Sequence, residues 1–513
     1  MKTRLRESLM RLSPVRRGGL AFLCGAAGVA GLAPFYIWPL TILSFALCLV
    51  LMLGATTKKQ LFWTGWFYAF GYFTFGLYWI SLALHIDWAQ WWWLTPFAAI
   101  GLPLYLSIHF GLAALVLWKL RDNTAYFLVG SIVSFGLAEY FRGTLFTGFP
   151  WNLHGYIFMD SPISLNLNWM GAYGLNLVVF ALAAALAGGL YKKRAWALAA
   201  LLTGSVYAYG YIATFGAHAV TPMTDRTVMI VQPNIAQIDK WDRSKAELQF
   251  EEILQQSSTP DDNRPDLVVW PETAMTFRKP DLPVYARDLS NILASGQYLL
   301  SGITDVKANR DLTFDYFNSL IALNGDAKAV GQYNKHHLVP FGEYVPMRKY
   351  LRFGGVAQGI SSTGDFKPGP GPQTMTLPNN LRISPLICYE IIFPGRSFKK
   401  GDRPDAIVNI TNDGWYLGSI GPHQHLAMSR ARAIETGLPV IRAANTGISA
   451  VIDPFGRIIL SLPLQEKGTI LTGLPSAHPP TLFSRYGNGL FLVFSLLLAG
   501  LLISLRIKGN ATK

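Results

Sequence analysis

Charge is scarce in this sequence. Asp, Glu, Lys and Arg make up 14% of the 513 residues, whereas about 25% is usual in soluble proteins. Hydrophobic residues make up 51%, which excludes an intrinsically disordered chain, and the shortage of charge argues against a wholly soluble one. The composition therefore predicts a membrane protein.

Cysteine is also scarce, and the three that occur are Cys24, Cys48 and Cys388. The first two lie in apolar runs, so no disulfide framework is expected and Cys388 is the lone cysteine of the polar part. The formal net charge is +14, but the basic residues fall in short clusters between apolar runs. That placement argues against a nucleic-acid partner and favours charge that sets membrane topology.

Eight apolar runs are long enough to cross the roughly 30 Å hydrocarbon core of a bilayer as helices. They span residues 18–34, 37–55, 62–84, 92–118, 126–140, 167–191, 196–215 and 487–505. We therefore expect a membrane domain of seven transmembrane helices over residues 18–216 and an eighth transmembrane helix over 487–505.

Lysine and arginine are distributed along these runs in a way that predicts their orientation. Basic clusters precede the first run and follow the second, fourth, sixth and eighth, while the intervening short loops carry almost none. Because positively charged loops stay in the cytoplasm, the basic N-terminus at 1–17 and the tail at 506–513 are expected there. Seven crossings then put residues 221–484 outside the cytoplasm.

Charges return in residues 221–484, which alternate between strand and helix patterns. Short apolar runs predict strands at 227–232, 266–270, 298–304, 381–387, 406–410 and 440–444. Helical spacing predicts helices at 244–256 and 423–436, and Asn324-Gly325 predicts a hairpin between 318–323 and 327–333. This order predicts an α/β domain with a mixed sheet and helices on its faces.

Three local motifs in this domain carry reactive side chains. Glu272 ends the apolar segment VVWPE, where a carboxylate could act as a general base. Lys335 lies in YNKHHLVPFGE and could be a fixed cation, and Cys388 lies in ICYE and could be a nucleophile whose thiolate fraction rises beside a base or a cation. Taken singly, each also fits a structural role: an acid that caps the next element, a solvated lysine and a buried thiol.

Together and in this order, the motifs resemble the Glu, Lys and Cys motifs of the nitrilase superfamily of carbon-nitrogen hydrolases. With the predicted spans, the chain resembles the membrane branch of that superfamily, the bacterial apolipoprotein N-acyltransferases. The resemblance implies an αββα sandwich in which Glu272 is the base, Lys335 stabilises the oxyanion and Cys388 is the nucleophile. The residues to which it gives supporting or substrate-binding roles are Glu343 (beside Lys335 or the base), Tyr389, Glu390 and Trp241 (beside the acyl chain).

The same resemblance implies a reaction and a location. A phospholipid gives an acyl chain to the Cys388 thiol, and the thioester then acylates the α-amine of the S-diacylglyceryl cysteine of an apolipoprotein. The expected location is the bacterial inner membrane, with the catalytic domain in the periplasm. No cofactor, metal or nucleic acid is implied, and we expect a monomer whose partners are the two lipid substrates and the bilayer.

Other functions are compatible with parts of the sequence. A membrane-tethered carbon-nitrogen hydrolase would use the same triad, and a cysteine protease would use His337 as the base of Cys388. A transporter with an appended binding domain would need ionisable residues in its spans. Glu139 and Arg142 are the candidates for that role, although a structural ion pair explains them equally well.

Two further segments invite a functional interpretation. Residues 350–364 combine apolar side chains and Arg352 with glycines, directly after Arg348 and Lys349, so this segment either dips towards the bilayer or packs on its own domain. The pair His336-His337 together with His423 and His425 has the residue type of a zinc site. No acid or cysteine joins them at metal spacing, so we expect no metal there.

The basic clusters generate a direct test of topology. Reporter fusions at Lys193 and at Gly325 should report opposite compartments, because the first follows the sixth run and the second lies in the domain after the seventh. Compartment-specific activity of the two fusions in cells measures this. Equal signals from both sites would contradict the predicted orientation.

Overall fold

The computed structural model describes residues 7–215, 220–240, 242, 244–260, 264–346 and 365–511. Trp241 and the segment 350–364 therefore lie outside the described residues. The chain divides into two compact units. A helical unit takes the N-terminal part up to 219 with 419–435 and 480–513, and an α/β unit takes 220–418 and 436–479.

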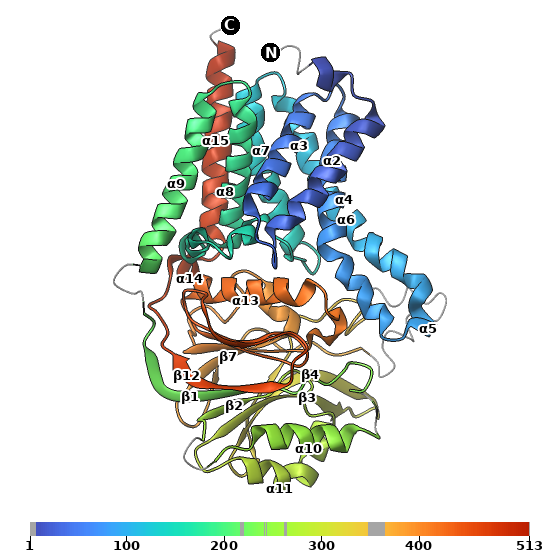
Figure 1. Ribbon diagram of the computed structural model, residues 1–513, viewed down its shortest axis with the longest axis vertical. Coiled ribbons are helices and arrows are strands. Elements are labelled where there is room, and N and C mark those ends of the chain that lie inside the picture. The colour runs from blue at the N-terminus through green and yellow to red at the C-terminus, as the bar shows by residue number, and fades with distance from the viewer. Residues whose placement is uncertain are drawn as a thin grey trace. The chain divides into compact units, whose positions relative to one another are not determined.

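Helices occupy all eight apolar runs in the described part of the chain (Figure 1). They are α2 (Pro14–Gly28), α3 (Trp38–Leu53), α4 (Lys58–Leu77), α6 (Thr95–Val116), α7 (Thr124–Thr144), α8 (Leu167–Gly189), α9 (Arg194–Phe215) and α15 (Gly489–Ala511). By length and composition, five described helical stretches could cross a membrane: Lys58–His85, Trp88–Leu120, Thr124–Thr144, Pro162–Gly189 and Arg194–Thr214. Trp38–Leu53 and Gly489–Ser504 are shorter apolar helices. An apolar helical region is thus confirmed, with five candidate spans in the described residues where the sequence predicts eight.

A buried ion-pair network lies inside the helical unit. Arg142 Nε donates to Glu139 Oε2 at 2.9 Å, and His154 Nδ1 bonds to the other carboxylate oxygen of Glu139. Arg142 Nη1 also donates to the carbonyl of Trp151 at 2.8 Å. Because all three ionisable side chains are buried and pair with one another, the network supports the structural interpretation of Glu139 and Arg142 over an ion path.

The α/β unit contains two six-stranded sheets. The first has the order β12-β1-β2-β3-β4-β5, and its strands are β1 (Met223–Gln232), β2 (Leu267–Val269), β3 (Tyr298–Ala308), β4 (Phe314–Asn324), β5 (Ala329–Asn334) and β12 (Gly468–Pro475). The second has the order β11-β10-β9-β8-β7-β6, with β6 (Met375–Thr376), β7 (Arg382–Ile387), β8 (Ala406–Thr411), β9 (Val440–Ala444), β10 (Ser449–Ile452) and β11 (Ile458–Leu462). All six predicted strands and the β4–β5 hairpin are confirmed.

The strands at the centre of each sheet run parallel. In the first sheet β1, β2 and β3 pair in parallel, and in the second β7, β8 and β9 do. Buried parallel strands carry near-continuous apolar runs, which explains why these strands could be predicted from the sequence. Parallel strands also bring their carboxyl ends to one edge of the sheet, and the candidate site residues follow such ends.

Side-chain alternation along β2 shows how the layers stack. Leu267 and Val269 belong to a buried core shared by strands of both sheets, so the two sheets pack face to face. Val268 points the other way, into a second core with α10 (Ala246–Ser257) and α11 (Leu282–Ile292). The α/β unit therefore has two stacked sheets with helices on the outer face of the first.

The helix α13 (Gly421–Thr436) follows β8 in the chain but packs within the helical unit. Gln424 Oε1 accepts hydrogen bonds from the indoles of Trp79 at 3.2 Å and Trp151 at 2.8 Å. Glu435 Oε1 accepts one from the backbone N–H of Ala172 at 2.9 Å. These buried polar contacts explain why residues 419–435, which the sequence assigns to the 221–484 domain, group with the helical unit instead.

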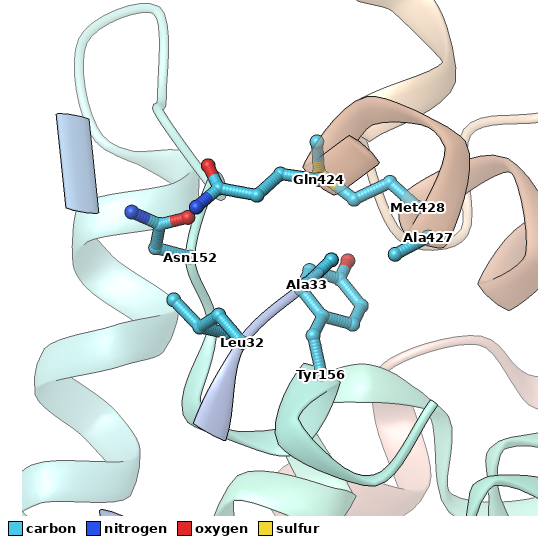
Figure 2. A pocket seen from close by; sticks show the side chains of 7 residues that line it. All are labelled: Leu32, Ala33, Asn152, Tyr156, Gln424, Ala427 and Met428. Carbon is cyan, nitrogen blue, oxygen red and sulfur yellow. The ribbon is translucent and has the colours of Figure 1, made fainter. Parts of the chain in front are cut away.

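A small cavity lies beside Gln424, whose hydrogen bonds to the two indoles anchor α13 within the helical unit (Figure 2). It has a volume of about 10 Å³, roughly enough for one water molecule. Asn152 Nδ2 donates to the carbonyl of Gly76 at 2.9 Å, which fixes the orientation of that amide, as the two indoles fix Gln424. The lining residues are Leu32, Ala33, Asn152, Tyr156, Gln424, Ala427 and Met428.

Replacement of Gln424 tests the anchor. Gln424→Met keeps the side-chain length but removes the acceptor shared by two buried indoles, which should lower the free energy of unfolding by about 1–3 kcal/mol. The measurement is the thermal midpoint of the purified protein. Gln255→Met makes the same chemical change at an exposed position of α10 and serves as the control. Equal midpoints for the two variants would contradict the anchoring role.

Candidate active site

Glu272 lies just beyond the carboxyl end of β2 and is 7% exposed. The chain passes close to β3 at this point, because a Cβ on Gly302 would lie 2.6 Å from the Cα of Glu272. A glycine at 302 is therefore required for Glu272 to sit against the sheet. The next residue, Thr273, has a φ of 50°, so the chain turns sharply directly after the carboxylate.

Lys335 directly follows β5, and its side chain is 1% exposed. Its Nζ lies 2.9 Å from Glu343 Oε1 and 3.5 Å from Glu272 Oε1. Asn318, on β4, donates through Nδ2 to those same two oxygens, each at 2.8 Å. One ammonium and one amide thus hold both carboxylates together in a buried site.

Both carboxylate oxygens of Glu343 make contacts that fix its side chain. Besides its contacts through Oε1, its Oε2 accepts a hydrogen bond from the backbone N–H of Val339 at 2.8 Å. Burial alone would lower the pKa of the Lys335 ammonium, but Glu343 and then Glu272 raise that pKa above its usual value. Lys335 is therefore a permanent cation throughout the physiological pH range.

Cys388 directly follows β7 and begins the short helix η10 (Cys388–Ile392). Its φ is 50°, a left-handed conformation that is uncommon for a residue with a side chain and that often marks functional positions. The Cys388 thiol lies within electrostatic range of Glu272 and Lys335 and hydrogen-bonds the side chain of Thr411. The three residues of the motifs thus share one buried site.

The resting form of Cys388 differs from the activated thiolate that the sequence suggests. Burial raises the pKa of the Cys388 thiol, and the Glu272 carboxylate raises it further, while Lys335 and Thr411 lower it by less. The net effect is a pKa above the usual value, so the resting group is the neutral thiol. A thiol of this kind needs a base that accepts its proton during attack.

Glu390 connects the segments that carry the thiol and the ammonium. Its carboxylate accepts the backbone N–H of Ile387 at 2.8 Å, next to Cys388, and that of His336 at 2.8 Å, next to Lys335. The Tyr333 hydroxyl also donates to it at 2.8 Å. Burial would raise the pKa of Glu390, but the hydrogen bond and charge of His336 lower it below the usual value. An ionised Glu390 thus holds the segment of Cys388 and the segment of Lys335 at a fixed position relative to each other.

Tyr389 and His337 form an aromatic wall beside this site. The His337 ring lies 5.7 Å from the Tyr389 ring and 3.9 Å from that of Phe393, measured between centroids. Burial, helped by the charge of Arg396, lowers the pKa of His337 to about 4. His337 is therefore neutral and poorly basic at pH 7. Within the described residues, no group of three His, Cys, Asp or Glu side chains could hold a metal ion.

The structure also brings residues to the site that the sequence analysis missed. Asn318 lies on a strand whose alternation gave no chemical signal, and its role depends on contacts with residues 46 and 25 positions away. Lys240 is 2% exposed, and its Nζ donates to the carbonyl of Glu272 at 2.8 Å. A lone lysine between predicted elements gave no reason to single it out. Trp241, which the resemblance includes, lies outside the described residues.

Comparisons with known proteins agree with both parts of the chain. A family model described as carbon-nitrogen hydrolase matches residues 227–478, and one described as apolipoprotein N-acyltransferase N-terminal domain matches 24–185. The apolipoprotein N-acyltransferase of Allorhizobium ampelinum is 36% identical over 98% of this chain and 98% of its own length. That of Rhizobium rhizogenes is 37% identical over 90% of each. The chain is thus similar to these relatives along almost its whole length.

Two solved structures match about half of this chain. A CN-hydrolase superfamily protein from Xanthomonas campestris is 19% identical, with a TM-score of 0.36, over 49% of this chain and 91% of that protein. An amidase from Nesterenkonia is 17% identical, with a TM-score of 0.36, over 51% of this chain and 94% of that one. The family model identifies this part as a carbon-nitrogen hydrolase fold.

Because the Cys388 thiol is neutral at rest, its alkylation rate can show whether Glu272 or His337 accepts its proton. Glu272→Gln should slow alkylation of Cys388 by iodoacetamide by about 10²-fold if the carboxylate accepts the thiol proton. His337→Ala should change the rate little, because the ring is already a poor base. Peptide mapping by mass spectrometry isolates Cys388 from Cys24 and Cys48. Faster alkylation in Glu272→Gln would mean that Glu272 acts only through its charge, which raises the pKa of the thiol.

Proposed function

Because this chain belongs to the apolipoprotein N-acyltransferase family, we propose that it transfers a fatty acyl chain from a phospholipid to an apolipoprotein through a Cys388 thioester. The acceptor is the α-amine of the S-diacylglyceryl cysteine at the lipoprotein N-terminus. The observation that carries the mechanism is the buried cluster of Cys388 with Glu272 and Lys335. These side chains supply a nucleophile, a base and a fixed cation in one site.

The first half-reaction forms the thioester. Glu272 accepts the Cys388 proton while the sulfur bonds to the ester carbonyl carbon, and the carbonyl electron pair moves onto its oxygen. The Lys335 ammonium and the backbone N–H of Tyr389 stabilise this oxyanion, each donor by about 3–4 kcal/mol. As the intermediate collapses, the bond from carbon to the glycerol oxygen breaks, and that oxygen takes the proton from Glu272. The lysophospholipid leaves and the acyl chain stays on sulfur.

The second half-reaction releases the acyl chain to the amine. Glu272 accepts one proton from the α-ammonium, and the neutral amine attacks the thioester carbonyl. Glu272 passes this first proton to solvent and then accepts a second proton from the nitrogen of the tetrahedral intermediate, which the same oxyanion donors stabilise. The carbon–sulfur bond breaks, and the sulfur takes that second proton from Glu272. Because Glu343 and Glu272 raise its pKa, Lys335 keeps its charge in both halves and accepts no proton. The site therefore needs one residue that carries protons, Glu272, and one fixed cation, Lys335.

The supporting residues keep this geometry. Glu343 holds the ammonium at 2.9 Å, which leaves Glu272, 3.5 Å away, free to exchange protons with the thiol and the amine. Glu390 fixes the backbone beside both Cys388 and Lys335. Tyr389 contributes its backbone N–H and one side of the aromatic wall. A role for Trp241 beside the acyl chain stays a prediction from the resemblance.

The proposed setting is the bacterial inner membrane. Eight helices cross it, both termini are cytoplasmic, and residues 221–484 lie on the periplasmic side, as the spacing of the basic clusters supports. Substrates reach the site from the bilayer, since both the phospholipid and the acylated cysteine carry long acyl chains. The protein acts as a monomer without a metal, cofactor or nucleic acid.

A covalent acyl intermediate tests the proposed function. Purified protein incubated with phospholipid vesicles alone should gain one acyl mass on the peptide that contains Cys388, and hydroxylamine should remove it. Two bulky lipid substrates compete for one thiol, so ping-pong kinetics should follow. Intact-protein and peptide mass spectrometry measure the adduct.

Matched variants complete this experiment. Cys388→Ser should form little adduct, because a hydroxyl is a far weaker nucleophile in the same surroundings. Lys335→Met should slow adduct formation by about 10²–10³-fold through the loss of one oxyanion donor. Normal transfer to a lipoprotein acceptor by Cys388→Ala would refute the thioester route.

A further inference from the structure

Lys240 is a second buried lysine at the active site. It lies between β1 and α10, is 2% exposed, and its Nζ donates to the backbone carbonyl of Glu272 at 2.8 Å. This carbonyl lies beyond the last residue of β2, so it is outside the strand ladder. Lys240 therefore supplies a donor at the point where the chain turns into Thr273, whose φ is 50°.

A neutral donor could satisfy that carbonyl, so the charge of Lys240 requires its own explanation. Burial of an ammonium without nearby negative charge is costly. Glu272 and Cys388 are the groups that favour its charged form, and the side chain of Glu272 also contacts Lys335, which pairs with Glu343. Glu272 and Glu343 carry two negative charges, and Lys335 offsets one of them. Lys240 offsets the other, so the four side chains of Glu272, Glu343, Lys335 and Lys240 carry no net charge, and the nearby Asp413 carboxylate has its own cation in Arg442 at 2.7 Å.

We infer that Lys240 is a positioning residue for the base, which fixes the main chain of Glu272 and balances its negative charge. This inference rests on the proposed roles of Glu272 and Cys388. Without Lys240 this cluster would carry one excess negative charge, and that charge would raise the pKa of the Cys388 thiol further. The thiol would then give up its proton less readily, and the main chain of Glu272 would lose the hydrogen bond that fixes it.

The inference has a signature in the pH profile. Burial lowers the pKa of Lys240 to about 8, although Glu272 and then Cys388 raise it. A lysine with a lowered pKa is charged below that value and loses its charge as the pH rises through it. The contribution of Lys240 should therefore be complete near pH 7 and should disappear above about pH 8.

The experiment compares the full-length protein with Lys240→Met and Lys240→Arg. The first readout is the initial rate of Cys388 acylation by vesicles of phosphatidylethanolamine and phosphatidylglycerol, and the second is the rate of Cys388 alkylation by iodoacetamide, both from pH 5 to 10. Lys240→Met should lose about tenfold or more in both rates at pH 7 and should lack the change near pH 8 that the titration of Lys240 gives the wild type. Lys240→Arg should recover most of the rate and keep it above pH 8, because arginine stays charged.

Controls separate this role from a merely structural one. Lys245→Met removes a half-exposed lysine that pairs with Asp239, and it should leave both profiles unchanged. Thermal midpoints identify any variant that fails to fold. Wild-type rates and profiles in Lys240→Met would overturn the inference, as would equal losses in Lys240→Met and Lys240→Arg without a shift in pH dependence.

The two readouts also separate this inference from the proposed function. A wild-type protein that never forms a thioester would defeat the proposed function, while the alkylation profiles would still report the effect of Lys240 on the thiol. Thioester formation in the wild type with no effect of Lys240→Met would defeat the inference alone.

Discussion

The sharing of one buried ammonium between two carboxylates is the interaction on which this active site depends. Lys335 lies 2.9 Å from Glu343 and 3.5 Å from Glu272, and its side chain is almost fully shielded from water. Removal of one partner from such a cluster leaves an uncompensated buried charge, which costs several kcal/mol. The cluster therefore constrains three chain segments at once. The two stacked sheets act as the rigid frame that brings these segments together.

Much of the fold could be predicted from the sequence, because its central strands are buried and apolar along their whole length. The short strands β6 and β10 and the edge strands β11 and β12 escaped prediction, since their patterns are brief or half-exposed. The sequence also identifies the three motif residues, because each follows a strand that could be predicted. They are Glu272, Lys335 and Cys388. Asn318 and Lys240 could not be identified in this way, because their importance comes from long-range contacts that leave no local spacing. The packing of α13 with the helical unit escaped prediction for the same reason.

The helical unit uses polar side chains differently from the active site. Glu139, Arg142 and His154 satisfy one another, and Gln424 satisfies two indoles, so these groups specify how helices meet. In the candidate active site both carboxylates are also paired with Lys335, but Glu272, the proposed base, lies 3.5 Å from this cation, whereas Glu343 lies 2.9 Å from it. Full pairing stabilises a scaffold, whereas a carboxylate that must exchange protons needs weaker pairing.

The burial of Cys388 has a consequence for its chemical lifetime. Peroxide and similar oxidants react with the thiolate, and they do so faster when the sulfur is exposed. A thiol that is 6% exposed, and whose burial raises its pKa, is a poor target for them. The same shielding that keeps the Cys388 thiol protonated therefore also preserves it in the reduced state. Protection from oxidation and the proposed dependence on Glu272 as a base are two results of the same buried position.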